Sequence, residues 1–326
     1  MTNLYIVSTP YHLLISIIKT ILANRVGKDI IIIYNFHIPS RTIKNAEIIF
    51  QKIYQCNHID ILLNLICLKI KLSRIPLLSR SIKLKFDKSF LKTKEIYLYN
   101  DNSFFGCLLN YLQINYNLIE DGLNVFKSSK FKKKQKKTDG RIYRLLGFSW
   151  YNHGHSKFIK SIEVNEDKDL QIHHANTIEK NRLEMFKKLS SKEINVIAKI
   201  FDYAPLKSIT PGNKTLLLTQ PLSEVSIVDH STKIRIYQYL VKRYCTGTLY
   251  IKKHPAEKED YQKIFPNAII LENQTIPFEV YQLKENFHFN RAITACSTVI
   301  DAIYCADEKI SMGSEWVKNF PNNIVQ

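Results

Sequence analysis

The chain has 326 residues, which suits two domains of about 150 residues better than one core. Hydrophobic residues make up 45% and charged residues 23%, a composition that excludes intrinsic disorder. Lys and Arg number 47 against 29 Asp and Glu, and the net charge of +18 favours anionic partners: polyanions, lipid surfaces or charged small substrates. No zinc-finger, RNP-like or recognition-helix pattern accompanies this charge, so we expect no nucleic-acid partner.

Cysteine spacing and the apolar runs bear on the compartment. The six cysteines have no CxxC spacing, and the apolar flanks of Cys67 and Cys107 are typical of buried free thiols in a reducing compartment. The first residues enter a strand pattern without a basic region or cleavage site, and residues 59–70 are too few to cross a bilayer. We expect a cytoplasmic protein, with surplus lysines able to hold it at an anionic inner membrane face.

In the first half, strands and helices alternate. Apolar runs predict strands over residues 4–7, 29–35, 95–99 and 116–119. Helical spacing predicts helices over residues 10–18, 41–56 and 103–112. The lysine-rich residues 127–137 predict a solvated loop, and residues 140–210 are polar and irregular apart from a helix over 182–199.

The second half repeats the alternation. Strands are expected over residues 215–219, 248–252, 268–272 and 291–294, and helices over 231–244, 277–283 and 297–305. The pattern predicts an α/β fold of two Rossmann-like domains facing a cleft, residues 1–205 and 206–326. Ligands of such sheets bind beyond the carboxyl ends of the strands.

Two acids and a glycine end the strand over 116–119. Glu120 and Asp121, followed by Gly122, place a carboxylate at the sheet edge, where the glycine frees the turn. Adjacent carboxylates raise one another's pKa, which predicts a base for an acceptor hydroxyl. A polar turn is the alternative.

A histidine follows the strand over 248–252. Lys253 makes its surroundings positive, and Pro255 fixes the chain behind the imidazole of His254. A histidinium there can neutralise or protonate a departing phosphate. The alternative is a histidine whose hydrogen bonds are satisfied within the structure.

Two further strand ends carry polar residues. Ser297 and Thr298 open a predicted helix, where hydroxyls and free backbone N–H groups hold a phosphate or simply cap the helix. Thr219 and Gln220 follow the strand over 215–219, with the Glu224 carboxylate beyond them, and an ordinary helix start explains them equally well.

Other patterns are weaker. Asp167 and Asp169 have DxD spacing but lie in a polar loop, and His153, His155 and the pair at 173–174 lack an accompanying acid or thiol framework. There is no Gly-rich phosphate loop and no GxSxG elbow. We therefore expect no metal and no serine hydrolase.

Together the motifs resemble the bacterial sialyltransferases, most closely glycosyltransferase family 52, which includes lipooligosaccharide and capsular polysaccharide sialyltransferases. The resemblance lies in ordered short segments: residues 4–14 with Thr9, Tyr11 and His12, the acid-acid-Gly motif at 120–122, residues 217–222, Lys253-His254-Pro255, and Ser297-Thr298.

The resemblance implies a GT-B architecture and a metal-independent, inverting transfer from CMP-N-acetylneuraminic acid. The implied acceptor is a terminal sugar, galactose in first place, of a capsule or lipooligosaccharide, and a homodimer is a reasonable assembly. Alternatives are a transferase of this fold that uses a UDP-hexose or CDP-polyol, or a non-catalytic glycan-binding protein.

By analogy, His254 is the general acid at the CMP phosphate, which Ser297 and Thr298 hold. Pro277 and Glu279 lie near the nucleoside, with Glu279 a ribose contact. Asp121 is the expected base. Some family members place an acid where this chain has Leu222, which leaves Glu224 as the reserve. The remaining substrate-side residues implied are Thr9, Tyr11, His12, Glu120, Gly122, Thr219, Gln220, Lys253 and Pro255.

Overall fold

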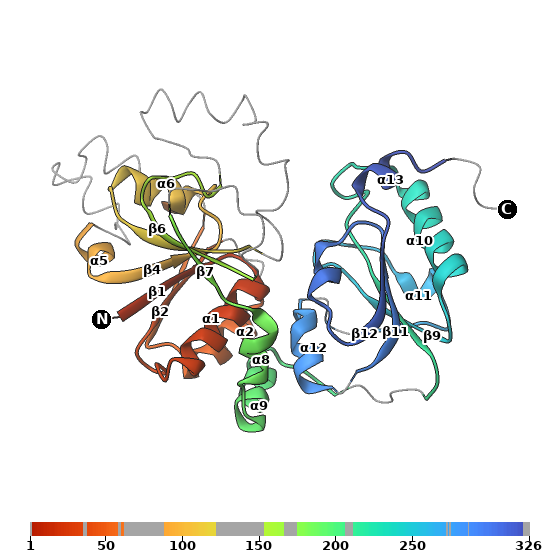
Figure 1. Cartoon of the computed structure of the whole chain (residues 1–326), viewed down its shortest axis with the longest axis horizontal. Coiled ribbons are helices and arrows are strands. Elements are labelled where there is room, and N and C mark those ends of the chain that lie inside the picture. Colours follow the sequence, from red (N-terminus) through yellow and green to blue (C-terminus); the bar gives the residue numbers. More distant parts are fainter. Residues whose placement is uncertain are drawn as a thin grey trace. The chain divides into compact units, whose positions relative to one another are not determined.

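The computed structural model describes residues 2–34, 38–57, 60–61, 88–121, 153–165, 175–205, 211–271, 273, 275–285 and 287–321. The chain divides into two compact units, Met1–Glu193 and Ile194–Gln326 (Figure 1). Each unit is built on a parallel sheet with helices between the strands, so the expected α/β fold of two Rossmann-like domains is confirmed.

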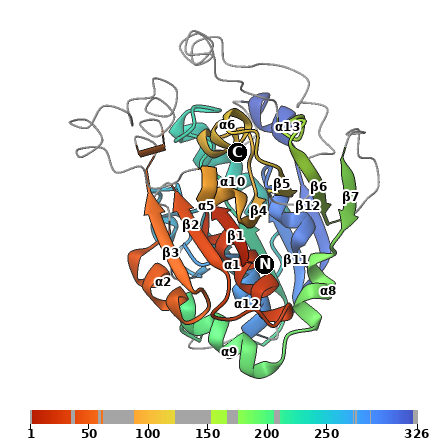
Figure 2. The same ribbon diagram turned by 90° about the vertical axis from the view of Figure 1, so that its left-hand side faces the viewer.

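The first unit contains a seven-stranded parallel sheet in the order β3-β2-β1-β4-β5-β6-β7, with β3 and β7 at its edges (Figure 2). Its strands are β1 (Thr2–Val7), β2 (Ile30–Tyr34), β3 (Lys52–Cys56), β4 (Lys94–Leu98), β5 (Tyr116–Ile119), β6 (Ile159–Val164) and β7 (Asn176–Glu179). Its helices are α1 (Pro10–Leu22), α2 (Ser40–Asn45), the 3₁₀ turn η1 (Ala46–Ile48), α5 (Lys88–Lys92), α6 (Phe104–Tyr111) and α8 (Arg182–Lys187), and α9 (Ser191–Ile200) runs into the second unit.

β1 and β2 are interior strands of this sheet, and their residues are mostly apolar. The four isoleucines of β2 are buried, as expected for a strand covered on both faces. The turn after β1 starts α1, where the Thr9 hydroxyl accepts the backbone N–H of His12 at 3.2 Å and Pro10 occupies the first turn. These two features fix the direction in which α1 leaves the sheet.

The second unit contains a five-stranded parallel sheet in the order β10-β9-β8-β11-β12. Its strands are β8 (Lys214–Leu218), β9 (Thr248–Lys252), β10 (Ile269–Ile270), β11 (Phe289–Thr294) and β12 (Ala306–Ser311). Its helices are α10 (His230–Tyr244), α11 (Tyr261–Ile264), α12 (Phe278–Lys284), the 3₁₀ turn η5 (Thr298–Ala302) and α13 (Ser314–Lys318).

In each sheet the chain begins with an interior strand, adds strands out to one edge, and then adds the remaining strands on the other side of the first one. The chain reverses this direction between β1 and β4 in the first sheet and between β8 and β11 in the second. Connections that leave adjacent strands in opposite directions open a crevice at the carboxyl ends, where doubly wound sheets bind ligands. The segments after β1, β4 and β5, and after β8, β9 and β11, are therefore the places to look for a site.

Several expected elements were wrong, most of them at sheet edges. The helix expected over 41–56 is α2 and η1 followed by β3, and the expected helix over 182–199 is the pair α8 and α9. Residues 140–210 contain β6 and β7, and residues 297–305 form the short turn η5 ahead of β12. Edge strands such as β3 and β12 mix exposed and buried residues, so they lack the continuous apolar run that marks a central strand. The lysine-rich residues 127–137 lie outside the described residues.

Gly106 allows α6 to approach the end of β4. A Cβ at this position would lie 1.8 Å from the carbonyl oxygen of Asp101. Although alanine is favoured over glycine in helices by about 1 kcal/mol, we expect Gly106→Ala to lower the free energy of unfolding by about 1–3 kcal/mol, because the backbone must shift.

Urea unfolding measures this change. The control is Lys192→Ala on the exposed face of α9, which should change the free energy by less than about 0.5 kcal/mol. A Gly106→Ala protein as stable as the wild type would contradict the close packing of α6.

Candidate active-site residues at the two sheet edges

Three neighbouring strands of the first sheet end in polar residues. Ser8 follows β1 and leads to His12 on α1, Asp101 lies just after β4, and Asp121 lies just after β5. Because β1, β4 and β5 are adjacent and parallel, these residues share one edge of the sheet. This edge flanks the point where the strand order reverses.

Asp121 is held by His12. The imidazole Nε2 lies 2.6 Å from Asp121 Oδ1. His12 is buried at 1% exposure, whereas the Asp121 side chain is 35% exposed. The carboxylate is thus the member of this pair that a solute can reach.

A second histidine–aspartate pair lies at the same edge. His153 Nδ1 is 2.6 Å from Asp101 Oδ1, and both side chains are buried. Asp101 also accepts the backbone N–H of Gly154 at 3.0 Å and the Tyr116 hydroxyl at 3.1 Å. In the sequence His153 lacks an accompanying acid, because Asp101 comes from the end of β4, far away in the chain.

The pKa of Asp121 lies below its ordinary value. Burial, the largest single influence, raises this pKa, but the charge and hydrogen bond of His12, together with His153 and a hydrogen bond from Asn100, outweigh it. The expectation that Glu120 would raise it was wrong. Glu120 is buried and accepts the backbone N–H of Asn165 at 2.8 Å. Successive residues of an extended chain point to opposite sides, so the two carboxylates have separate surroundings.

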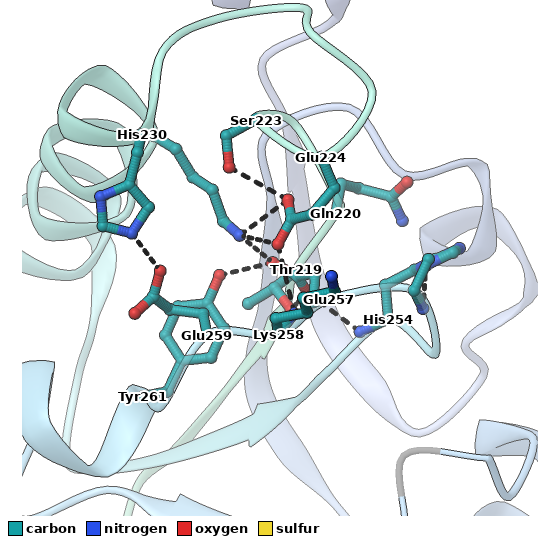
Figure 3. A network of polar contacts seen from close by, with 12 residues as sticks. Thr219, Gln220, Ser223, Glu224, His230, His254, Glu257, Lys258, Glu259 and Tyr261 are labelled. Carbon is teal, nitrogen blue, oxygen red and sulfur yellow. Dashed lines mark hydrogen bonds and ion pairs between the residues drawn. The ribbon is translucent and has the colours of Figure 1, made fainter.

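The polar residues of the second unit are connected through Glu257 (Figure 3). Glu257 is buried, and its Oε1 contacts Lys233 Nζ at 3.0 Å and accepts the Tyr261 hydroxyl at 2.6 Å. Its Oε2 accepts the backbone N–H of His254 at 3.1 Å and the Thr219 hydroxyl. One buried carboxylate therefore holds the loops after β8 and β9 together.

His254 lies half-buried in the loop after β9. Its Nδ1 accepts the backbone N–H of Ala256 at 3.1 Å, so in the neutral ring the hydrogen is on Nε2. Burial lowers the pKa of His254, and nearby Lys252 lowers it further, while Glu257 and Glu224 oppose the shift. The imidazole thus offers an N–H donor at Nε2 and is easily deprotonated.

Both carboxylate oxygens of Glu224 make contacts within the protein. Its two oxygens lie 2.9 and 3.1 Å from Lys233 Nζ, and Oε1 accepts the backbone N–H of Lys258 at 3.3 Å. Burial alone raises the pKa of Glu224, but these hydrogen bonds outweigh it and lower the pKa to about 2. Gln220 is also fixed, because its backbone N–H donates to the Tyr237 hydroxyl at 2.6 Å.

The loop after β11 completes the polar edge of the second sheet. Ser297 is buried, and its hydroxyl accepts the backbone N–H of Val299 at 3.3 Å, which caps η5. The Thr294 hydroxyl accepts the Ser297 N–H at 3.1 Å and donates to the carbonyl of Leu218 at 2.9 Å. These contacts tie the ends of β11 and β8 together. Thr298 begins η5, and its side chain is not described.

Glu279 is buried in the first turn of α12, directly after the helix cap Pro277. Burial raises the pKa of Glu279, and nearby Lys252 opposes the increase. Burial in turn lowers the pKa of Lys252 to about 8. Sequence analysis did not identify Lys252, whose position one residue before Lys253 at the end of β9 is the feature that marks it.

The remaining expected site residues are placed as follows. Thr9 caps α1, Tyr11 is half-buried, Lys253 is half-buried, and Pro255 is exposed. Gly122 and the segments containing Asp167, Asp169 and the histidines at 173–174 lie outside the described residues. Within the ranges that the structure describes, no three His, Cys, Asp or Glu side chains form a group able to bind a metal ion, and no helix has the length and apolar character to span a bilayer.

Lys233 provides a test of the Glu257 network. Lys233→Met leaves two carboxylates, Glu224 and Glu257, without their shared cation, and Glu257 is fully buried. We expect the free energy of unfolding to fall by about 3–5 kcal/mol, as when one partner of a buried ion pair is removed.

Chemical denaturation of the purified proteins measures the loss. The matched control is Lys187→Met, which breaks the exposed pair with Glu184 and should cost less than about 1 kcal/mol. Equal losses in the two variants would show that Lys233 does not sustain the network.

Comparison with known proteins identifies the family. Residues 40–312 match the model of glycosyltransferase family 52. A protein of Haemophilus influenzae described as uncharacterized is 28% identical over 213 residues, which are 65% of this chain and 66% of that relative's length. The solved 2,6-sialyltransferase of Photobacterium sp. JT-ISH-224, in a ternary complex with the donor product CMP and the acceptor substrate lactose, has a TM-score of 0.56 at 14% identity, covering 95% of this chain and 71% of that one.

A sialyltransferase from Photobacterium damsela has a TM-score of 0.50 at 13% identity, over 95% of this chain and 74% of that chain. At such identities these likenesses show the fold, which is of the GT-B type. The family match covers most of the sequence, from the start of α2 to the end of β12. The chain belongs to glycosyltransferase family 52.

Proposed function

We propose that the protein is a sialyltransferase that transfers sialic acid from CMP-N-acetylneuraminic acid to a terminal sugar of a surface glycan. The observation that carries the proposal is that each sheet presents one group for acid–base chemistry at the carboxyl ends of its strands, one strand away from the point where the strand order reverses. Asp121 follows β5 of the first sheet, and His254 follows β9 of the second. Family membership and the GT-B fold support it.

Asp121 is the general base of this proposal. Its carboxylate is partly exposed, held at one oxygen, and ionised at neutral pH because its pKa is lowered. It takes the proton from the acceptor hydroxyl as the hydroxyl oxygen attacks the anomeric carbon. Glu224 is less suited, because Lys233 and the Lys258 N–H occupy its oxygens.

His254 is the general acid. Its Nε2–H stabilises the CMP phosphate as the bond between the anomeric carbon and the phosphate oxygen breaks, and a protonated imidazole gives up its proton to that oxygen. Ala256 holds Nδ1 through its backbone N–H, so the ring presents Nε2. The single displacement inverts the anomeric carbon.

We also propose positions for the phosphate and the nucleoside of the donor. We place the phosphate at the start of η5, by Ser297 and Thr298, and near the cationic Lys253. Pro277 and the buried Glu279 at the start of α12 lie near the nucleoside. The reaction as proposed needs no metal ion.

The net charge of +18 suits a donor that carries a phosphate and a carboxylate, and it also suits attachment to an anionic membrane face in the cytoplasm where lipid-linked acceptors are displayed. Galactose of a capsule or lipooligosaccharide is the acceptor we favour, and a homodimer the assembly.

The central test is CMP release from CMP-N-acetylneuraminic acid in the presence of a galactoside. We expect Asp121→Asn and His254→Ala each to lower turnover by roughly a hundredfold or more, because each removes one proton transfer. Circular dichroism checks that both variants remain folded.

The controls use an exposed histidine–aspartate pair of the same unit as His254, His288 and Asp307, whose side chains lie 3.0 Å apart. His288→Ala and Asp307→Asn should keep wild-type turnover. UDP-glucose and CDP-ribitol should be inert. Turnover of either donor in place of the CMP-sugar, or full activity of both site variants, would overturn the proposal.

The pH dependence of kcat/KM gives a second test. Asp121 must be deprotonated, and its pKa lies below the usual 3.8, so activity is lost only in strong acid. His254 must be protonated, and its pKa lies below the usual 6.5, so kcat/KM should decline as the pH rises through that lower value. We expect the maximum on the acid side of neutrality.

Initial rates over a range of pH at low substrate concentration give the profile. The decline toward alkaline pH should disappear in the residual activity of His254→Ala and persist in His288→Ala. A decline that survives in His254→Ala would assign it to another group.

A further inference from the structure

We propose that His12 is a positioning residue for the base: its Nε2–H orients the Asp121 carboxylate, and the backbone N–H of Ser8 fixes the tautomer that makes this possible. The inference rests on the proposed role of Asp121. It concerns a residue for which the sequence resemblance implied contact with substrate, and it places that residue behind the carboxylate instead.

The hydrogen-bond partners determine the tautomer. The backbone N–H of Ser8 donates to His12 Nδ1 at 3.3 Å. A backbone N–H has no acceptor capacity, so Nδ1 accepts and the neutral ring carries its hydrogen on Nε2. That hydrogen is directed at Asp121 Oδ1, 2.6 Å away. The Ser8 hydroxyl, also 3.3 Å from Nδ1, can donate in the same direction.

The ring is fixed in place as well as in tautomer. It stacks on Tyr99, with centroids 4.4 Å apart and planes 9° apart. The Tyr99 hydroxyl is hydrogen-bonded to the Ser16 hydroxyl at 2.9 Å, which in turn donates to the carbonyl of His12 at 2.8 Å. These contacts close a loop between β4 and α1 that leaves the imidazole little freedom.

Burial separates a positioning role from a catalytic one. His12 is 1% exposed and both of its ring nitrogens have partners within the protein, so it cannot meet an acceptor hydroxyl. Asp121 is exposed enough to do so. Holding one carboxylate oxygen sets the orientation of the other, and a misplacement of about 1 Å is enough to cost roughly a hundredfold in rate.

Other groups also face Asp121. The titratable neighbours in the described ranges are His12 on α1, His153 ahead of β6 and Tyr34 on β2, and Asn100 after β4 is a neutral donor. Among these, His12 makes the largest favourable contribution to the ionised carboxylate, through its hydrogen bond in the neutral ring and additionally through its charge when the ring is protonated. Without His12, burial still raises the pKa of Asp121, and the main contribution that lowers it is gone.

Two substitutions separate the hydrogen bond from the packing. His12→Phe retains an aromatic ring on Tyr99 and removes the N–H, whereas His12→Gln retains an N–H donor at a similar reach. We expect His12→Phe to lower kcat by roughly ten- to a hundredfold with little change in KM, and His12→Gln to recover most of the loss. His288→Phe, at the exposed histidine–aspartate pair, should behave as the wild type.

The acid limb of the pH profile shows whether a slower His12→Phe protein has lost the hydrogen bond to Asp121 or only packing. Asp121 is active when deprotonated, so its lowered pKa places the acid limb at low pH. Without the His12 contact the pKa of Asp121 rises, and the acid limb should move to higher pH in His12→Phe but stay in place in His12→Gln. A slower His12→Phe with an unmoved acid limb, or no rescue by His12→Gln, would reduce His12 to a packing role and overturn the inference.

A measurement that needs no substrate separates this inference from the proposed function. A carboxyl group whose pKa is lower in the folded state stabilises that state above its unfolded pKa, and this contribution is lost as the pH falls through the folded pKa. Asp121→Asn should therefore destabilise the protein more at about pH 6 than at about pH 3. This pH-dependent difference should shrink in a His12→Phe background.

The outcomes are distinct. Full activity of Asp121→Asn refutes the proposed base, even if the stability coupling between His12 and Asp121 is found. An inactive Asp121→Asn together with a His12→Phe protein of wild-type kcat and unchanged stability coupling refutes the role of His12 and leaves the base intact.

Discussion

The position of the first strand in each sheet determines which loops meet at the sheet edge. β1 and β8 lie inside their sheets, and the chain builds outward on one side before it crosses to the other. Parallel strands end at the same edge, so residues far apart in the sequence meet there. Ser8, Asp101 and Asp121 share an edge for this reason, as do Thr219, His254 and Ser297.

Buried carboxylates keep these edges rigid. Asp101 and Glu257 are inaccessible, and each has several partners within the protein: a histidine, a backbone N–H and a tyrosine hydroxyl for Asp101, and a lysine, a tyrosine, a threonine and a backbone N–H for Glu257. Several partners around one buried carboxylate hold it in a single arrangement, because an unpaired buried charge is very costly. Asp121 differs in being partly exposed.

Sequence analysis located the central strands and the two groups proposed for catalysis, because apolar runs such as the isoleucines of β2 are unambiguous and Asp121 and His254 directly follow strands. It missed β6, whose polar residues are buried against partners elsewhere: Ser161 donates to Asn117 and Glu163 pairs with Lys19. No local pattern records such pairs.

The same limit explains the partners of the site residues. Asp101 and His153 are far apart in the sequence and come together only in the folded first unit. Glu257 lies two residues after Lys253-His254-Pro255, the motif that indicated His254. The direction of the Asp121 pKa was wrong because Glu120 is adjacent in sequence but lies in different surroundings. Composition and motif order predict the class of fold. The direction in which the pKa of a carboxylate shifts can be predicted only when its neighbours in space are known.

The two polar networks have a consequence for how this family can be altered. The described contacts that fix Asp121 all come from the first unit, and those that fix His254 all come from the second. Each polar network is thus assembled within its own domain. In a chimera that takes its second domain from another family member, the loop that holds the imidazole would arrive intact and the carboxylate of the recipient would keep its own contacts, so the two polar edges can be recombined separately.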